Sequence, residues 1–116
     1  MPVITVDHSA ALDGRLDRPG LAGAVHRACV EHVAARIPAC KTRFRRAEET
    51  VVGDAAEEAS VVHIEIALLA GRTEEARTAL AEAVLALLPA HLKEAQGVHL
   101  SVEVRDLAPA YRSALG

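Results

Sequence analysis

The sequence predicts one α+β domain in which two β-α-β units build a four-stranded mixed sheet with two helices on one face. Three observations predict this architecture. Four segments are extended by composition or alternate between apolar and polar residues, as strands do. Two further segments repeat apolar residues with the period of a helix, and each lies between two of the extended segments. The length of 116 residues fits a single domain over residues 1–116.

The first unit covers about residues 2–52. Val3–His8 is rich in β-branched residues and is expected to be a strand. A helical repeat of apolar residues begins at Leu21 and should end before Pro38, because the residue ahead of proline disfavours helical backbone. Ala39–Val52 then reads as the second extended segment, with basic residues alternating along it.

The second unit covers about residues 59–105. Ser60–Leu69 is the clearest strand, because its apolar residues alternate strictly. A helix should follow Thr73, whose hydroxyl is a good N-cap. Val98–Arg105 alternates again and predicts the last strand, and residues 106–116 read as an irregular tail.

The strands should give the sheet one apolar face and one mixed face. In each unit the two strands should be parallel and joined by a right-handed helical crossover, which places both helices on the apolar face. The mixed face suits a hydrated contact between copies of the chain better than a second dry core. Its polar residues are Thr5, Asp7, His63, Glu65, His99, Ser101 and Glu103.

Composition argues against several classes of protein. The net charge of −3 does not suggest a nucleic-acid-binding protein. No signal peptide is recognised, and no apolar run approaches the about 20 residues that span a bilayer. Cys29 and Cys40 lack CxxC spacing and read as free thiols in a reducing compartment such as the cytoplasm, with a disulfide left open. The six histidines show no ligand spacing, so no metal is expected.

The chain begins Met1-Pro2, which allows two interpretations. In the simpler one, Pro2 opens the first strand, a position where its missing N–H is tolerated. In the other, Met1 is removed because the next residue is small, and Pro2 becomes a free secondary amine. Nearby cations and burial both lower the pKa of such an amine, so that it could act as a base near neutral pH.

Three cations are candidate binders of an acidic substrate. Arg72 lies at the start of the second helix, where unpaired N–H groups favour an anion that a guanidinium can hold bidentately. Lys41 and Arg43 are two residues apart on a strand and so share a side. The alternatives are a solvated turn arginine and an exposed basic strand, or ion pairs of the strand with Glu48, Glu49, Glu57 or Glu58.

Three stretches together resemble the 5-carboxymethyl-2-hydroxymuconate isomerase family of the tautomerase superfamily. They are Met1-Pro2 opening the first strand, Pro38–Arg43 opening the second, and Val62–Glu75, a strand that ends in Gly-Arg before a helix. The resemblance runs from Pro2 to about Leu107. The last stretch is the most specific of the three.

The resemblance implies a homotrimer around a central channel and an isomerase that needs no metal and no cofactor. It implies Pro2 as catalytic base and acid, and cations that hold the carboxylates of an unsaturated 2-hydroxy or 2-oxo dicarboxylate, such as 5-carboxymethyl-2-hydroxymuconate in aromatic catabolism. Arg72 matches the family's arginine after glycine. Lys41 stands where other members carry arginine, and Arg43 is the further candidate.

Two rival functions remain open at this point. One is a non-catalytic trimeric binding module of the same fold, in which Pro2 only opens a strand. The other is a tautomerase for a different enolic acid, such as a phenylpyruvate-like compound.

Overall fold

A computed structural model describes residues 1–54 and 59–116. Glu57 and Glu58, considered above as partners of the basic strand, lie outside the described residues. None of the helices described is long and apolar enough to cross a membrane. The main elements are β1 (Val3–Ser9), α1 (Arg18–Val33), β2 (Lys41–Ala47), β3 (Val61–Leu68), α2 (Glu74–Leu87) and β4 (His99–Asp106).

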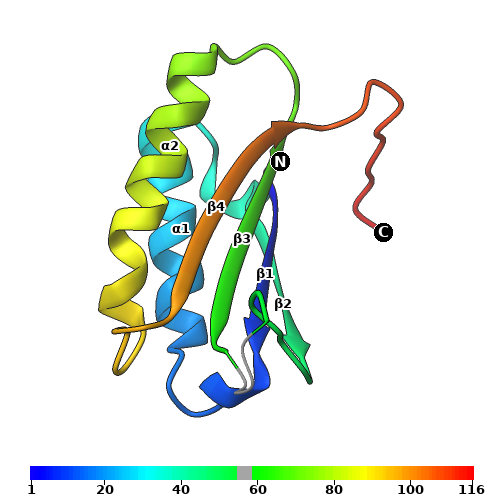
Figure 1. Cartoon of the computed structure of the whole chain (residues 1–116). Coiled ribbons are helices and arrows are strands. Elements are labelled where there is room, and N and C mark those ends of the chain that lie inside the picture. The colour runs from blue at the N-terminus through cyan, green and yellow to red at the C-terminus, as the bar shows by residue number, and fades with distance from the viewer. Residues whose placement is uncertain (55–58) are drawn as a thin grey trace.

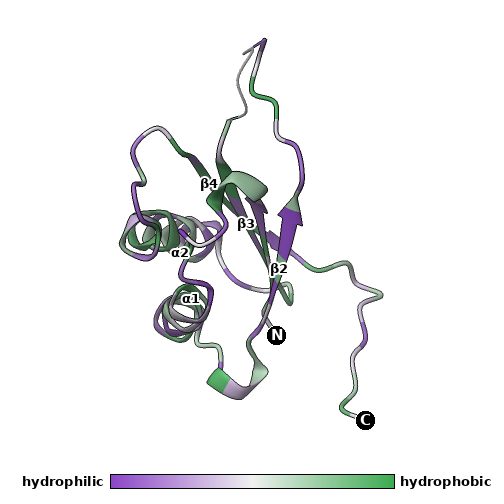
Figure 2. Ribbon diagram, turned by 90° about the horizontal axis from the view of Figure 1, so that it is seen from below, coloured by the Kyte–Doolittle hydropathy of each residue, from purple (hydrophilic) through white to green (hydrophobic). Residues whose placement is uncertain are grey.

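The four strands form one mixed sheet in the order β2-β1-β3-β4. β1 is parallel to β2, β3 is parallel to β4, and the two units meet through antiparallel pairing of β1 with β3. Both helices lie on the same side of the sheet (Figures 1 and 2). The structure therefore confirms the predicted mixed sheet covered by two helices on one face.

The core lies between this sheet face and the helices. Alternate residues of β1 and β3 point into it, and so do residues three or four apart on α1 and α2, as the apolar periods predict. These side chains are removed from water, which is the main favourable contribution to the stability of such a domain. The fully buried ones include Ile4, Val6, Val62, Ile64, Ile66, Leu68, Leu21, Val25, Leu80 and Val84.

The first helix starts earlier than expected and ends, as expected, before Pro38. It begins at Arg18 rather than at Leu21, because the Asp17 carboxylate accepts a hydrogen bond from the Gly20 N–H at 3.2 Å and caps the helix. Proline is well tolerated in a first turn, so Pro19 does not delay the start. The helix ends at Val33, before the predicted limit at Pro38.

The other boundaries follow the sequence more closely. Thr73 caps α2 as predicted, with its Oγ1 accepting from the Ala76 N–H at 3.1 Å. The second extended segment is shorter than Ala39–Val52, because a 3₁₀ turn occupies Ile37–Ala39 and the strand itself covers Lys41–Ala47.

One end of the sheet gathers the segments that matter for the site. We call it the N-terminal edge: β1 and β2 begin there, at Val3 and Lys41, and β3 and β4 end there, at Leu68 and Asp106 (Figure 1). Val3 pairs with Lys41 on one side and with Ala67 on the other. The end of α1 and the start of α2 lie at the same edge.

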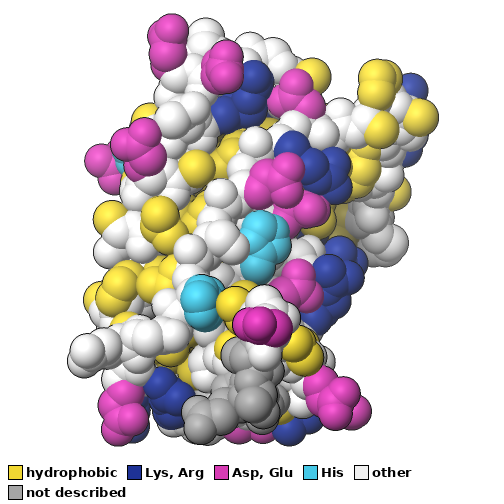
Figure 3. All heavy atoms as spheres, viewed as in Figure 1, with side chains coloured by type: hydrophobic (Ala, Val, Ile, Leu, Met, Phe, Trp, Pro, Cys, Tyr) yellow, Lys and Arg dark blue, Asp and Glu magenta, His cyan; other side chains and the backbone are white. Residues whose placement is uncertain are grey.

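The sheet face away from the helices, here called the open face, carries charged and polar side chains. Figure 3 shows Lys, Arg, Asp, Glu and His side chains gathered over the strands. Arg45 pairs with Asp7 at 3.0 Å, and Arg105 pairs with Glu65 at 3.1 Å. Thr5, between these pairs, is only 6% exposed. Two ion pairs therefore lie on the open face, which is charged and polar where the opposite face is apolar.

Candidate active site

Pro2 is held firmly at the N-terminal edge. It is buried, and its carbonyl accepts a hydrogen bond from the Lys41 N–H at 3.2 Å. Because β1 pairs on both sides, the start of the chain cannot swing away from β2 and β3 without breaking sheet hydrogen bonds. The fold thus fixes the position of any amine that Pro2 would carry.

The environment of this edge lowers the pKa of the Met1 α-amino group. Partial burial lowers the pKa of the Met1 α-amino group below its ordinary value of 8.0, and the positive charges of Lys41 and Arg72 lower the pKa further. Cys40 acts in the opposite direction on that pKa. Lys41 and Arg72 therefore both lower the pKa of the Met1 amine, whereas their effect on a Pro2 amine stays a prediction.

Lys41 is exposed at the first position of β2. Its Nζ donates to the Ala39 carbonyl at 3.1 Å, which uses one of the three donors of the ammonium. The remaining donors are available to an anion that approaches the edge from solvent.

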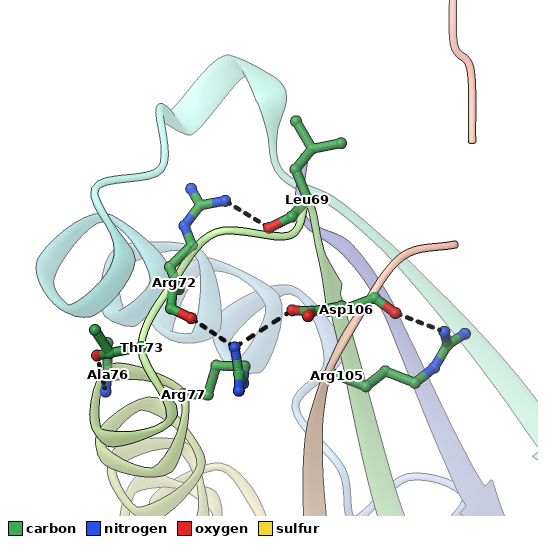
Figure 4. A network of polar contacts seen from close by, with 7 residues as sticks. All are labelled: Leu69, Arg72, Thr73, Ala76, Arg77, Arg105 and Asp106. Carbon is green, nitrogen blue, oxygen red and sulfur yellow. Dashed lines mark hydrogen bonds and ion pairs between the residues drawn. The ribbon is translucent and has the colours of Figure 1, made fainter. Parts of the chain in front are cut away.

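Arg72 binds the protein itself, which the sequence did not predict. Its Nη1 donates to the Leu69 carbonyl at 3.1 Å, and its Nη2 donates to the Val33 carbonyl at 3.0 Å (Figure 4 shows the bond to Leu69). Val33 is the last residue of α1, so the guanidinium satisfies a carbonyl that has no partner within the helix. Only two of the five N–H donors of Arg72 are used in this way.

The turn that carries Arg72 is itself fastened. Gly71 has a φ of +123°, a backbone conformation that favours glycine. The Nη1 of Arg77, on α2, donates to the Arg72 carbonyl at 2.6 Å and contacts the Asp106 carboxylate at 3.5 Å (Figure 4). Strand β4 and helix α2 thereby fix the backbone of the Gly-Arg turn.

Arg43 lies apart from the other three residues. It pairs with Thr5 on the open face, two residues along β2 from Lys41 and so about 6–7 Å further from the edge. The structure therefore brings Pro2, Lys41 and Arg72 to one edge and leaves Arg43 exposed beside it.

A shallow hollow of about 580 Å³ adjoins Arg72. It is formed by the end of α1, Glu31–Ala34, and by the turn Ala70–Arg72. Pro2 does not line this hollow. An anion that bridged Pro2 and Arg72 would therefore have to bind on the side of the guanidinium that faces the N-terminus.

Two residues that sequence reasoning did not assign to the site lie beside Met1 and Pro2. Burial raises the pKa of the Cys40 thiol, and Cys40 directly precedes Lys41, so parallel pairing places it beside Pro2. The Tyr111 hydroxyl, from the tail, donates to the Met1 Sδ at 3.0 Å. The available signal for Tyr111 was its rarity, since it is the only tyrosine and the chain has no tryptophan.

Of the histidines, His32 lines the hollow beside Arg72, and two others make hydrogen bonds elsewhere. His63 Nδ1 and the Ser101 Oγ are 2.7 Å apart on the open face. His26 Nε2, on α1, is 2.7 Å from the Oγ1 of Thr42, on β2. Across residues 1–54 and 59–116, no three His, Cys, Asp or Glu side chains are grouped so that they could hold a metal ion.

Comparison with known proteins gives one family and one fold. The family model described as 5-carboxymethyl-2-hydroxymuconate isomerase matches residues 2–114. No curated protein matches the chain. Among solved structures, a 5-carboxymethyl-2-hydroxymuconate isomerase from Deinococcus radiodurans R1 is 24% identical, over 98% of this chain and 88% of that one, with a TM-score of 0.83.

Two further structures have the same fold. A 5-carboxymethyl-2-hydroxymuconate delta-isomerase is 16% identical over 100% of this chain and 89% of that one, with a TM-score of 0.80. A protein described as a Q0 fused 4-OT wild-type symmetric trimer is 20% identical over 97% of this chain and 90% of that one, with a TM-score of 0.72. At these identities the likeness is one of architecture.

Proposed function

Because the chain belongs to the 5-carboxymethyl-2-hydroxymuconate isomerase family, whose model matches residues 2–114, we propose that the amine of Pro2, exposed by removal of Met1, is its catalytic base and acid. The family makes the chain an isomerase of the tautomerase superfamily. The proposal is supported by the position of Pro2 at an edge shared with Lys41 and Arg72, where burial and these two cations already lower the pKa of the preceding Met1 amine; they should act on an exposed Pro2 amine in the same direction. A neutral amine is what proton abstraction near pH 7 requires.

The proposed reaction moves one proton within the substrate. The lone pair of the Pro2 nitrogen takes the proton of the enol hydroxyl, and the electrons shift through the conjugated double bonds. The resulting prolyl ammonium returns the proton to a carbon at the far end of the conjugated system. Nothing else is consumed, so the step needs no cofactor.

The proposed substrate is an unsaturated 2-hydroxy or 2-oxo dicarboxylate such as 5-carboxymethyl-2-hydroxymuconate. Compounds of this class are intermediates in aromatic catabolism. Lys41 and the unused donors of Arg72 would hold its carboxylates beside Pro2. Arg43, exposed a short distance along β2, would bind a carboxylate that reaches past Lys41 from the N-terminal edge. The free thiols Cys29 and Cys40 suit a reducing compartment, which fits a cytoplasmic enzyme.

We also propose that three copies assemble through their open faces. The helices cover only the other face of the sheet, and a structure of the same fold is described as a symmetric trimer. Native mass spectrometry should give three times the 12.2 kDa of one chain, less the three initiator methionines. A monomer at micromolar concentration would contradict this assembly.

The direct test of the chemistry compares wild type with Pro2→Ala. Intact mass first establishes that Met1 has been removed, because a retained Met1 would convert the amine into an amide. Ketonisation of 2-hydroxymuconate is then followed by ultraviolet absorbance. We expect Pro2→Ala to lose at least about a hundredfold in kcat, the contribution typical of a positioned base.

The rival functions predict other results. Equal rates for wild type and Pro2→Ala would favour the non-catalytic binding module. Wild-type activity confined to a phenylpyruvate-like enol would favour the tautomerase for a different acid.

A further inference from the structure

The chain after β4 turns back toward the N-terminus. The Leu107 N–H donates to the Leu68 carbonyl at 2.6 Å, which anchors the tail at the N-terminal edge. A turn follows, in which the Tyr111 N–H donates to the Ala108 carbonyl at 3.0 Å. Tyr111 is half-buried although the residues on either side of it are exposed. Near its end the tail thus reaches the rest of the chain through an aromatic side chain.

The partner of this ring is the residue that the proposed function removes. The Tyr111 hydroxyl donates to the Met1 Sδ at 3.0 Å, and a thioether sulfur is a weak acceptor. Loss of Met1 would remove that acceptor and vacate the space between the hydroxyl and Pro2. The hydroxyl would then be separated from the Pro2 nitrogen by about the length of the lost methionine side chain, and Lys41 begins the neighbouring strand.

We propose that Tyr111 is a substrate-binding residue, whose hydroxyl donates to an oxygen of the bound acid in the place where the Met1 sulfur now accepts. This inference rests on the proposed function, because it requires removal of Met1 and an acid at Pro2. It gives the C-terminal tail a role in binding, whereas the sequence indicated only an irregular segment.

The chemistry of a phenol suits this position. A third cation beside the amine would attract the acid but would also lower the pKa of the amine further and weaken it as a base. A neutral hydroxyl adds a directional donor without adding charge. The other aromatic ring, Phe44, contacts His8 with ring centroids 6.2 Å apart and lies further along β2, away from the edge.

The kinetic test removes only the hydroxyl. In Met1-free protein, Tyr111→Phe should lower kcat/KM for 5-carboxymethyl-2-hydroxymuconate by about tenfold or more, as expected for loss of one hydrogen bond to a charged group. Ser113→Ala is the matched control, because it removes an exposed hydroxyl from the same tail and should change kcat/KM by less than about twofold. The thermal midpoints of both variants should equal that of wild type. An active wild type with Tyr111→Phe within twofold of it would overturn the inference.

A second measurement does not depend on catalysis. Since Tyr111 is the only tyrosine and tryptophan is absent, tyrosine emission reports on this ring alone. Titration of the Met1-free protein with adipate, a saturated six-carbon diacid, should change the emission saturably. An inactive protein that shows this change would refute the proposed reaction and support Tyr111 as a ligand contact. Tyrosine emission that stays constant over the adipate concentrations that inhibit the enzyme would overturn the assignment of Tyr111. Constant emission in an inactive protein would overturn it as well.

Discussion

Replacing Arg72 separates its two roles, one in the fold and one in binding. Arg72→Ala removes two hydrogen bonds, to the Leu69 carbonyl at 3.1 Å and to the Val33 carbonyl at 3.0 Å. Bonds to charged groups contribute about 1.5–3 kcal/mol each, and water can replace part of this because the side chain is only half-buried. We therefore expect the free energy of unfolding to fall by about 2 kcal/mol in total.

Urea denaturation at a fixed protein concentration measures this loss, because oligomerisation would make the midpoint depend on concentration. A loss of that size should lower the urea midpoint by about 1 M for a domain of this length. Thr73→Ala is the neighbouring control, since it removes the N-cap of α2 at a cost of about 1 kcal/mol but leaves the guanidinium in place. An unchanged midpoint in Arg72→Ala would refute the role of these two bonds in holding α1 to the end of β3.

The same variant tests binding at a temperature where it remains folded. Arg72→Ala should raise KM for the dicarboxylate, because the unused donors of the fork are lost with the rest. Arg72→Lys should keep the charge and lose the bidentate geometry, so its KM should lie between those of Arg72→Ala and wild type. Unchanged KM and kcat in Arg72→Ala would leave Arg72 with its structural role alone.

Two further predictions follow from the pKa shifts. Lys41→Ala should raise the pKa of the terminal amine, so kcat/KM should rise with pH at a higher midpoint than in wild type. Arg45→Ala is the control, because it removes a cation that is paired to Asp7 further along β2 and should leave the midpoint in place. A lower or unchanged midpoint in Lys41→Ala would contradict the coupling between Lys41 and the amine. Burial raises the pKa of the Cys29 thiol to about 12, so iodoacetamide at pH 7.5 should not modify Cys29 until urea unfolds the protein. Peptide mass measures the alkylation, and rapid modification of Cys29 in the folded protein would contradict this prediction.

The sequence predicted the architecture because each element carries a local signal. The alternation of Val62, Ile64 and Ile66 predicts which face of β3 is buried, and all three are 0% exposed. The predicted start of α1 is wrong because composition assigns Asp17 to the preceding loop. The role of Asp17 as N-cap depends on a single hydrogen bond, from the Gly20 N–H to its carboxylate. Boundaries of this kind are set by single contacts rather than by a period.

The site was only partly predictable for a related reason. The strand pattern places Lys41 beside Val3, so a cation near Pro2 could be expected from parallel pairing. The bonds of Arg72 to the end of α1 and the return of Tyr111 to Met1 join residues 39 and 110 positions apart. No local pattern encodes such contacts, because they arise from how finished elements pack.

Lys41 and Arg72 have two proposed roles, to lower the pKa of the amine and to bind the dicarboxylate. Their net effect on the pKa should therefore change when substrate binds. In the free protein both charges lower the pKa of the terminal amine. A bound dicarboxylate brings negative charges that offset these cations, so the pKa of the amine should rise in the complex. The amine would then be neutral before binding and a stronger proton acceptor afterwards, which is the order that catalysis by Pro2 needs.

This reasoning gives a kinetic signature. The pH dependence of kcat/KM reports the pKa of the free enzyme, and that of kcat reports the pKa of the complex. We expect the rise of kcat with pH to have the higher midpoint of the two, because the carboxylates of the bound substrate stabilise the charged form of the amine. Equal midpoints in wild type, or a lower midpoint for kcat, would mean that the bound carboxylates do not raise the pKa of the amine.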